Sequence, residues 1–283
     1  MNSTRRRDVD RVDSPEFGRG MTDAHRARPL VPPGEWAASD PFLLMMEDVF
    51  PKGVFDRHPH RGIETITYVI DGTIEHYDNH GNAGTIGPGD ALWLTAGRGL
   101  IHHEQPGGDH PAHIYQLWLN LPRADKLVPA RYQELRSAEL PTRSANGVTE
   151  RVFSGRAGGL EAPTRNYAPV TMVETTLEAG ARTDLEVPAG FNGFIVAVQG
   201  SGTVGSSATS LAAGQVAWLT PDSEASTVEL AGGEKGFRAI LFAGQPLHEP
   251  VAARGPFVMN TDGELNEGFR EYRRTGERFG LEE

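Results

Sequence analysis

The chain has 283 residues, a formal net charge of −11, 34 glycines, 20 prolines and no cysteine. Its length is sufficient for two domains, and an apolar content of 38% is that of a globular protein. The acidic balance argues against direct binding to nucleic acid, and the lack of thiols excludes disulfides, iron–sulfur clusters and cysteine nucleophiles. No apolar run is long enough for a membrane span or a signal peptide, so we expect a cytoplasmic protein that does not bind membranes.

The first part of the chain indicates a flexible leader followed by a series of short strands. Residues 1–30 are polar and arginine-rich at their start, and we expect them to be mobile. From Asp40 onward, short apolar runs alternate with Gly, Pro, Asn and Asp about every ten residues, as is typical of an all-β barrel or sandwich. We therefore expect an N-terminal barrel over residues 31–135, with strands at 42–46, 63–70, 73–77, 91–94 and 114–119.

A polar connection separates this barrel from the rest of the chain. Residues 123–146 are more polar and contain a helix-compatible stretch at 130–135, and we place the linker at 136–147. A second β-rich domain then follows over 148–283. The alternation of charged and apolar residues at 264–274 predicts a short amphipathic helix near the C-terminus.

Parts of the second domain are similar in sequence to parts of the first. Residues 213–220 resemble residues 88–95, and residues 196–200 resemble residues 68–72. The two matches have nearly equal offsets, 125 and 128 residues along the chain. Such an internal repeat predicts a duplicated barrel.

Histidine is concentrated in one part of the sequence. Eight of the ten histidines lie between His58 and His113. In a strand, residues i and i+2 face the same side, so His58 and His60 can point together into a barrel, as can His102 and Glu104. Two strands would then present three imidazoles and one carboxylate, which suits a divalent first-row metal such as Fe, Mn, Ni, Cu or Zn. This set leaves coordination positions open, as catalysis requires.

A second carboxylate competes for the ligand position on the same grounds. Glu64 has the same parity as His58 and His60, so an unbroken strand would turn it inward as well. A bulge at 61–62 would break that parity and turn Glu64 away. The residues alone leave Glu64 and Glu104 as alternatives.

The other histidines of this region are assigned different positions. His76 and His80 lie near a predicted turn, and we expect them at the surface. His103 faces away from its two neighbours, which favours a structural role or one beside the ligands. His110 and His113 follow a Gly-Gly loop, and we expect them at the surface or at the mouth of the barrel.

The repeat has no counterpart of these ligands. The offsets place residues 186–188, Glu-Val-Pro, at the position of residues 58–60, and Thr227 at that of His102. We therefore expect one metal site per chain, in the N-terminal domain.

Several segments, in the right order between Asp40 and Thr261, resemble the pirins, a family of the cupin superfamily. The family motifs are recognised in H-P-H-R-G-I-E-T-I-T-Y-V-I-D-G at 58–72, the glycine-rich stretch that ends in L-I-H-H-E-Q-P at 81–106, Y-Q-L-W-L-N-L-P at 115–122, R-Y-Q-E-L-R-S-A-E-L-P at 131–141 and A-G-Q-P-L-H-E-P-V-A-A-R-G-P-F-V-M-N-T at 243–261. The resemblance implies an all-β bicupin, with two antiparallel double-stranded β-helix (jelly-roll) barrels face to face and a short C-terminal helix.

The resemblance also implies the occupant of the site. It implies one mononuclear metal per chain, Fe(II), with Mn, Ni, Cu or Zn as alternatives, held by His58, His60, His102 and Glu104. By this analogy Glu104 is the ligand and Glu64 is a neighbour of the site.

Two functions follow from the resemblance. Bacterial pirins are associated with quercetin 2,3-dioxygenase activity, in which O₂ opens a flavonol ring with loss of carbon monoxide; Glu104 would accept the proton of the flavonol 3-hydroxyl. Candidates for the pocket or its surroundings are Phe42, Glu64, His103, Tyr115 and Gln116. The alternative is an iron-dependent regulator without turnover, as in animal pirins, which would act through a protein partner.

Overall fold

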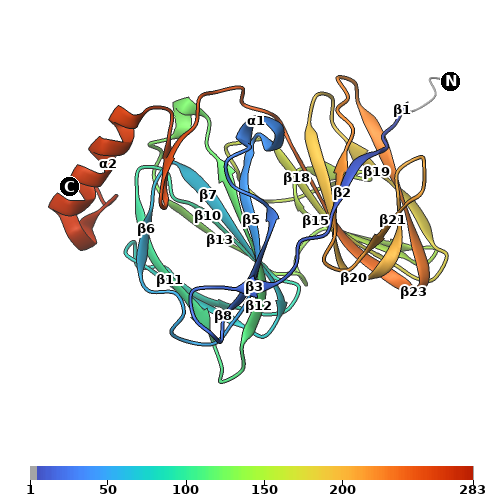
Figure 1. Ribbon diagram of the computed structural model, residues 1–283, viewed down its shortest axis with the longest axis horizontal. Coiled ribbons are helices and arrows are strands. Elements are labelled where there is room, and N and C mark those ends of the chain that lie inside the picture. The colour runs from blue at the N-terminus through green and yellow to red at the C-terminus, as the bar shows by residue number, and fades with distance from the viewer. Residues whose placement is uncertain (1–4, 283) are drawn as a thin grey trace. The chain divides into compact units, whose positions relative to one another are not determined.

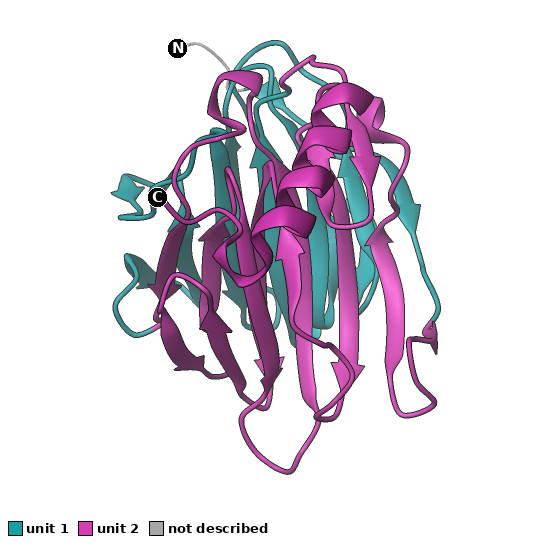
Figure 2. Ribbon diagram, turned by 90° about the vertical axis from the view of Figure 1, so that its left-hand side faces the viewer, with its two compact units in different colours: residues 1–16, 138–246 teal, residues 17–137, 247–283 magenta. Residues whose placement is uncertain are grey.

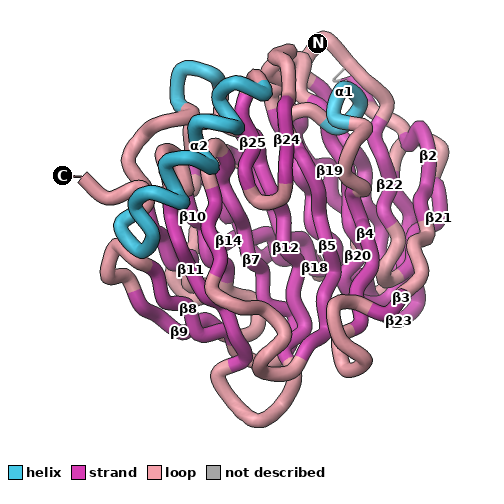
Figure 3. Tube along the Cα trace, turned by 60° about the vertical axis from the view of Figure 1, so that its left-hand side comes forward, coloured by secondary structure: helices cyan, strands magenta, loops and turns pink. Residues whose placement is uncertain are grey.

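The computed structural model describes residues 5–282, which are mostly strands (Figure 1, Figure 3). The chain divides into two compact units (Figure 2). Unit 1 consists of residues 1–16 and 138–246, and unit 2 of residues 17–137 and 247–283. Neither unit is one continuous segment, which differs from the expected division into 31–135 and 148–283.

Unit 2 contains a seven-stranded sheet in the order β13-β10-β7-β12-β5-β4-β3 and a four-stranded sheet in the order β6-β11-β8-β9. All of these neighbours pair antiparallel. The strands are β3 (Gly18–Arg19), β4 (Arg26–Val31), β5 (Phe42–Phe50), β6 (His58–His60), β7 (Ile63–Asp71), β8 (Ile74–Asp78), β9 (Ala83–Ile86), β10 (Ala91–Thr95), β11 (Leu100–Pro106), β12 (Ala112–Asn120) and β13 (Arg131–Leu135).

The strand β7 lies in the middle of the larger sheet, between β10 and β12. Its β-branched and aromatic residues suit a strand that is covered on both faces, and Ile63 to Val69 are all buried. Gly62 precedes it with φ of 76°, a conformation that favours glycine. A Cβ at Gly62 would also lie 1.9 Å from the carbonyl oxygen of Val258, so a larger residue does not fit there.

The C-terminal part of the chain packs onto unit 2. The hairpin of β24 (Ala252–Arg254) and β25 (Phe257–Met259) is followed by helix α2 (Asp262–Thr275), as Figure 3 shows. The helix begins at a capping box formed by Thr261 and Glu264. The expected C-terminal helix is confirmed. Unit 2 also contains the short helix α1 (Trp36–Ser39) and two 3₁₀ turns (Arg123–Asp125 and Gly276–Arg278).

Unit 1 is built around one ten-stranded sheet with the path β14-β15-β18-β23-β20-β22-β2, to which β1, β19 and β21 add. Its interior is a continuous apolar cluster, with valine, leucine, isoleucine, alanine and phenylalanine side chains. The strands are β1 (Arg5–Arg6), β2 (Val9–Asp13), β14 (Thr142–Ala145), β15 (Val148–Ser154), β16 (Arg156–Ala157), β17 (Leu160–Glu161), β18 (Val170–Leu177), β19 (Arg182–Val187), β20 (Asn192–Val204), β21 (Thr209–Ala212), β22 (Val216–Leu219) and β23 (Ser226–Gly244).

The expected flexible leader is wrong for the described residues of 1–30. Strand β1 pairs with β23 and β2 pairs with β22, both in unit 1, whereas β3 and β4 belong to unit 2. Arg7 anchors the segment, because its guanidinium is buried and donates to Ser226 Oγ and to the carbonyl oxygens of Phe191 and Asp222. The binding partners lie about 200 residues away in sequence, so no local pattern reveals them.

The helix-compatible stretch at 130–135 is strand β13, which pairs with β10. Backbone pairing with β10 outweighs the local preference of these residues for a helix. The expected linker at 136–147 likewise contains β14, which pairs with β15. The short connection near residue 137 is therefore all that separates the two units along this part of the chain.

The pairing of strands supports the duplication. In unit 2, Trp93 pairs with Ile66 and His102 pairs with His58. In unit 1, Trp218 pairs with Phe194 and Glu186 pairs with Thr227, the positions that the sequence offsets predict. No helix among the described residues is long and apolar enough to cross a membrane.

Candidate metal centre and its cavity

Strands β6 and β11 of the smaller sheet bring three histidines together. His58 lies directly opposite His102 in the antiparallel pair, and their Nε2 atoms are 3.2 Å apart. The ring of His60 lies 4.8 Å from that of His58 and 4.9 Å from that of His102, centroid to centroid. One ligand nitrogen from each of the three lies within 4.8 Å of the others.

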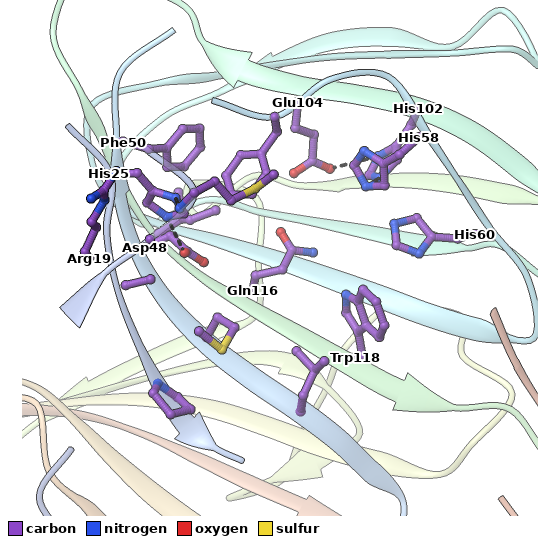
Figure 4. A pocket seen from close by; sticks show the side chains of 18 residues that line it. Arg19, His25, Asp48, Phe50, His58, His60, His102, Glu104, Gln116 and Trp118 are labelled. Carbon is purple, nitrogen blue, oxygen red and sulfur yellow. Dashed lines mark hydrogen bonds and ion pairs between the residues drawn. The ribbon is translucent and has the colours of Figure 1, made fainter. Parts of the chain in front are cut away.

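Glu104 lies on the other side of the His102 ring. Its Oε1 is 3.4 Å from His102 Nδ1 and 3.5 Å from His76 Nδ1, and these three atoms form a second group within 4.8 Å. The four predicted ligands are thus grouped around His102 as two trios that share this residue, not as one set of four. Figure 4 shows Glu104 beside His102, with His58 behind it.

The ionisation of these groups suits metal binding. Burial, with a smaller effect of His102, lowers the pKa of His58 to about 4, and burial also holds the pKa of His60 well below its usual range. Although burial raises the pKa of Glu104, the contacts with His102 and His76 outweigh it and hold that pKa well below its usual range. The two imidazoles are therefore neutral and the carboxylate ionised at pH 7, as metal ligands must be.

The hydrogen bonds of these side chains also suit metal binding. His58 Nδ1 donates to the carbonyl oxygen of Asp56 at 2.8 Å, which leaves the lone pair on Nε2, toward His102. Glu104 Oε1 and the Nδ1 atoms of His60 and His102 are buried without a hydrogen-bond partner among the described residues. Buried polar atoms are normally paired, so these atoms fit a site that is completed by a cation.

His76 was predicted at the surface, and this is wrong. Its side chain is 1% exposed and lies opposite Glu104 in the β8–β11 pair. Burial lowers its pKa, but Asp78 and Glu104 together raise it to about 9, so the ring is protonated at pH 7. The sequence held a signal for this position, because His76 and Asp78 are another i, i+2 pair on one strand face.

Glu64 is turned away from the metal centre, because the parity changes between β6 and β7 at Gly62. Glu64 is fully buried and accepts a hydrogen bond from Thr95 Oγ1 at 2.7 Å. Thr67, on the opposite face of β7, instead donates to Glu104 Oε2 at 2.8 Å and lies 2.9 Å from Gln116 Oε1.

A cavity of about 600 Å³ opens beside the three histidines and lies entirely within unit 2. Of the three predicted pocket residues, Gln116 lines it, whereas Phe42 and Tyr115 do not. Tyr115 is on the other face of β12, where its ring stacks on Tyr68. His103 does not line the cavity either.

The walls of the cavity come mainly from two paired strands. From β5 and β12 alternate residues face inward, in the pairs Leu44–Trp118, Met46–Gln116 and Asp48–Ile114. The segment before β5 closes another side with Arg19, Gly20, Met21, His25, Ala27 and Pro29. Residues of the expected leader are thus part of the cavity wall.

The remaining histidines of the region lie outside the cavity. His80 is half-buried and its Nε2 lies 3.2 Å from the carbonyl oxygen of Gly99. His110 is exposed, and His113 Nε2 is 2.7 Å from Glu47 Oε1. Both trios of potential ligands found among residues 5–282 belong to unit 2.

Two small-barrel units, each closed by antiparallel strands, and a histidine cluster inside one of them define a two-domain cupin. The chain belongs to the pirin family: residues 31–119 match the family model "Pirin", and residues 172–280 match the model "Pirin C-terminal cupin domain". It is 40% identical to the pirin of Rattus norvegicus over 239 residues, which are 83% of this chain and 81% of that protein.

Solved structures share the fold of this chain. A protein of Geobacillus kaustophilus is 43% identical, with a TM-score of 0.85 over 88% of this chain and 100% of that chain. A quercetin 2,3-dioxygenase of Acinetobacter baumannii is 26% identical, with a TM-score of 0.85 over 97% of this chain and 99% of that chain.

Proposed function

We propose that the protein is a metal-dependent oxygenase of the quercetin 2,3-dioxygenase type, which opens a flavonol-like ring with O₂. The observation that carries the proposal is the cluster of His58, His60 and His102 at one end of a largely apolar cavity of about 600 Å³. A cavity of this size and lining suits a flat aromatic molecule. The likeness to the A. baumannii quercetin 2,3-dioxygenase supports the reaction class.

The three histidines and Glu104 would hold one divalent metal, with Fe(II) as the proposed ion. Neutral imidazoles and one carboxylate suit this ion as well as Mn, Ni, Cu and Zn. When bound, the metal would supply a Lewis-acidic, redox-active centre at the end of the cavity. Glu104 would have to turn from the Nδ1 side of His102 to join His58 and His60.

Residues of the chain would transfer the proton and orient the substrate. Glu104 would accept the proton of the flavonol 3-hydroxyl, since it is ionised and buried. Thr67 would hold the second carboxylate oxygen during this transfer. The apolar walls from β5 and β12 would orient the rings and exclude water.

Oxygen uptake tests this proposal. The protein reconstituted with Fe(II) is mixed with quercetin, and the control is the His58→Ala/His60→Ala double variant, treated in the same way. We expect uptake that depends on the flavonol and that the double variant loses. If iron is bound and no uptake occurs, the flavonol reaction is rejected.

The second candidate is a regulator without turnover that acts through a protein partner. The 40% identity to the rat pirin supports this candidate, because the resemblance to animal pirins is what suggests a regulator. A partner that binds the Fe(II) and Fe(III) forms with different affinity, in a pull-down with purified metal-loaded protein, would support this role.

A further inference from the structure

The cavity has a second polar group, far from the histidines. Asp48 on β5 and His25 just before β4 both line it, and Figure 4 shows them at the opposite end from His58, His60 and His102. Both side chains are almost fully buried, with exposed fractions of 5% for Asp48 and 3% for His25.

The hydrogen bonds of this pair leave one carboxylate oxygen for a ligand. His25 Nδ1 accepts a hydrogen bond from the Met21 N–H at 3.0 Å, so the ring proton is on Nε2. This Nε2–H donates to Asp48 Oδ1 at 2.8 Å. Among the described residues, none donates to Asp48 Oδ2. A buried carboxylate with one hydrogen bond is costly, and a donor from a ligand would remove much of that cost.

The strand register gives the separation of the two polar ends. Trp118, whose ring lies 5.1 Å from that of His60, pairs with Leu44, whereas Asp48 pairs with Ile114. Four residues along a strand correspond to about 13 Å. A ligand that reaches both ends is therefore elongated, with at least two linked rings.

The surroundings of Asp48 indicate what kind of donor it meets. The rings of Phe50 and Phe55 pack next to His25, with Phe55 5.2 Å and Phe50 6.0 Å from it, centroid to centroid. This apolar lining suits an aromatic ring. Arg19 lines the same end of the cavity, with its guanidinium paired to Asp23 at 2.9 Å. A hydrogen-bond donor on an aromatic ring, a phenolic hydroxyl, suits both the apolar lining and the carboxylate oxygen of Asp48.

We propose that Asp48, positioned by His25, is the specificity-determining residue of the cavity and binds a phenolic hydroxyl at the end of the substrate opposite the metal. The inference rests on the proposed function, because that function places the reacting end of the substrate at the histidines. It adds that the Asp48–His25 pair recognises the hydroxyl on the distal ring of a flavonol or of a similar linked-ring aromatic.

Direct binding of two ligands tests the inference without turnover. The ligands are 3-hydroxyflavone, which has no other hydroxyl, and 4′,3-dihydroxyflavone, which has one on the distal ring. Affinities are measured by quenching of tryptophan fluorescence in the Zn-loaded protein, for wild type, Asp48→Asn, Asp48→Leu and the control His110→Ala, whose side chain is exposed and does not line the cavity. Circular dichroism and thermal unfolding establish that each variant is folded.

We expect the wild type and His110→Ala to prefer the dihydroxy ligand, and Asp48→Leu to lose about 10- to 100-fold of its affinity for that ligand alone. Asp48→Asn should lie between the two, because its one oxygen accepts from His25 and its amide N–H can donate to the phenolic oxygen. An Asp48→Leu protein with the same preference as wild type overturns the inference, as does a wild type that binds neither ligand. If the preference is found but the Fe(II) protein consumes no O₂, the oxygenase proposal fails and the distal site stands.

Discussion

His76 is held between two carboxylates, and this position gives it a defined task. Its Nδ1 faces Glu104 and its Nε2 faces Asp78, 3.4 Å from Oδ2. An imidazole that is fixed from behind by a carboxylate fixes in turn the group in front of it. We therefore expect His76 to keep the Glu104 carboxylate ionised and beside His102, within reach of the proposed metal.

Replacement of His76 by alanine should weaken metal affinity by about 10- to 100-fold, the usual cost of losing a partner of a metal ligand. The measurement is a competition titration of the metal-free protein with a chromogenic chelator. His103→Ala is the matched control, because His103 is next to the same ligands in sequence but does not line the cavity. Equal affinities of the His76→Ala and His103→Ala proteins would contradict an orienting role.

Lys126 is the other unusual buried group of unit 2. Its ammonium donates to the carbonyl oxygens of Gly62 and Val258 and to Asn120 Oδ1, and it thereby ties the C-terminal segment to the start of β7. Burial lowers its pKa to about 7, against the attraction of Glu249 and Glu264. In the unfolded chain the pKa of this lysine is near 10.5. Between pH 7 and 10.5 the lysine is therefore protonated in the unfolded chain but neutral in the folded protein.

The free energy of unfolding should therefore increase with pH from 7 to 9, by about 2 kcal/mol from this group. Below pH 7 both states are protonated and the increase is absent. Urea unfolding at pH 6, 7, 8 and 9 gives the free energy of unfolding of the wild type and of Lys126→Met. The variant has no ionisable group at this position, so the difference between the two proteins measures the effect of the lysine. Parallel curves for the two proteins would mean that the three acceptors keep the lysine charged.

At the scale of residues, the sequence predicted what depends on local geometry. The i, i+2 rule placed His58, His60, His102 and Glu104 on inward faces, and in the structure the other three lie around the His102 ring. The same rule puts His76 and Asp78 on one strand face, but it could not predict that this face lies beside Glu104, since that results from pairing with β11. It also could not decide on Glu64, whose direction depends on the parity change at Gly62.

Among the elements, the short strands β1 and β2 form many contacts with the rest of unit 1. They add to the sheet of unit 1 through β23 and β22, and Arg7 between them fills a buried position with three hydrogen bonds. Loss of the guanidinium removes the donor from one buried acceptor, Ser226 Oγ, and from two part-buried carbonyl oxygens.

We expect Arg7→Ala to lower the free energy of unfolding of unit 1 by about 2–4 kcal/mol. Arg5→Ala is the control and should change it by less than about 1 kcal/mol, because Arg5 forms only an exposed ion pair with Asp222. Urea unfolding followed by the fluorescence of Trp218, which packs beside this segment, reports the difference. Similar losses in both variants would show that β1 contributes only surface charge.

The elements that were predicted well are those whose own pattern agrees with their environment. Strand β7 has alternating β-branched residues and is central, and α2 has a capping box and an amphipathic pattern. Strand β13 was expected to be helix-compatible because Ala130, Glu134 and Leu135 suit a helix. Its conformation is decided by β10, which no residue of 130–135 encodes.

At the scale of the molecule, each unit takes a segment from the far end of the chain. Unit 1 contains the N-terminal strands and unit 2 the C-terminal residues 247–283. A cut after residue 137 would thus leave both fragments incomplete: residues 1–137 would lack β24, β25 and α2, and residues 138–283 would lack β1 and β2.

Each fragment alone should therefore show no cooperative thermal unfolding, whereas an equimolar mixture should regain it together with metal binding. Calorimetry of the fragments and of the mixture measures this, with the intact chain as the reference. Cooperative unfolding and metal binding by residues 1–137 alone would show that the C-terminal segment is dispensable for the site.

The exchange of end segments also sets an order of events during protein synthesis. Strand β2 leaves the ribosome long before its partner β22, which is made about 200 residues later. At about 5–20 residues per second, it waits about 10–40 s. The first part of unit 2, residues 17–137, likewise waits for residues 247–283, which are made more than 100 residues later. Neither half of the molecule can be completed until translation is close to its end, so the nascent chain must be kept from misassociation until then.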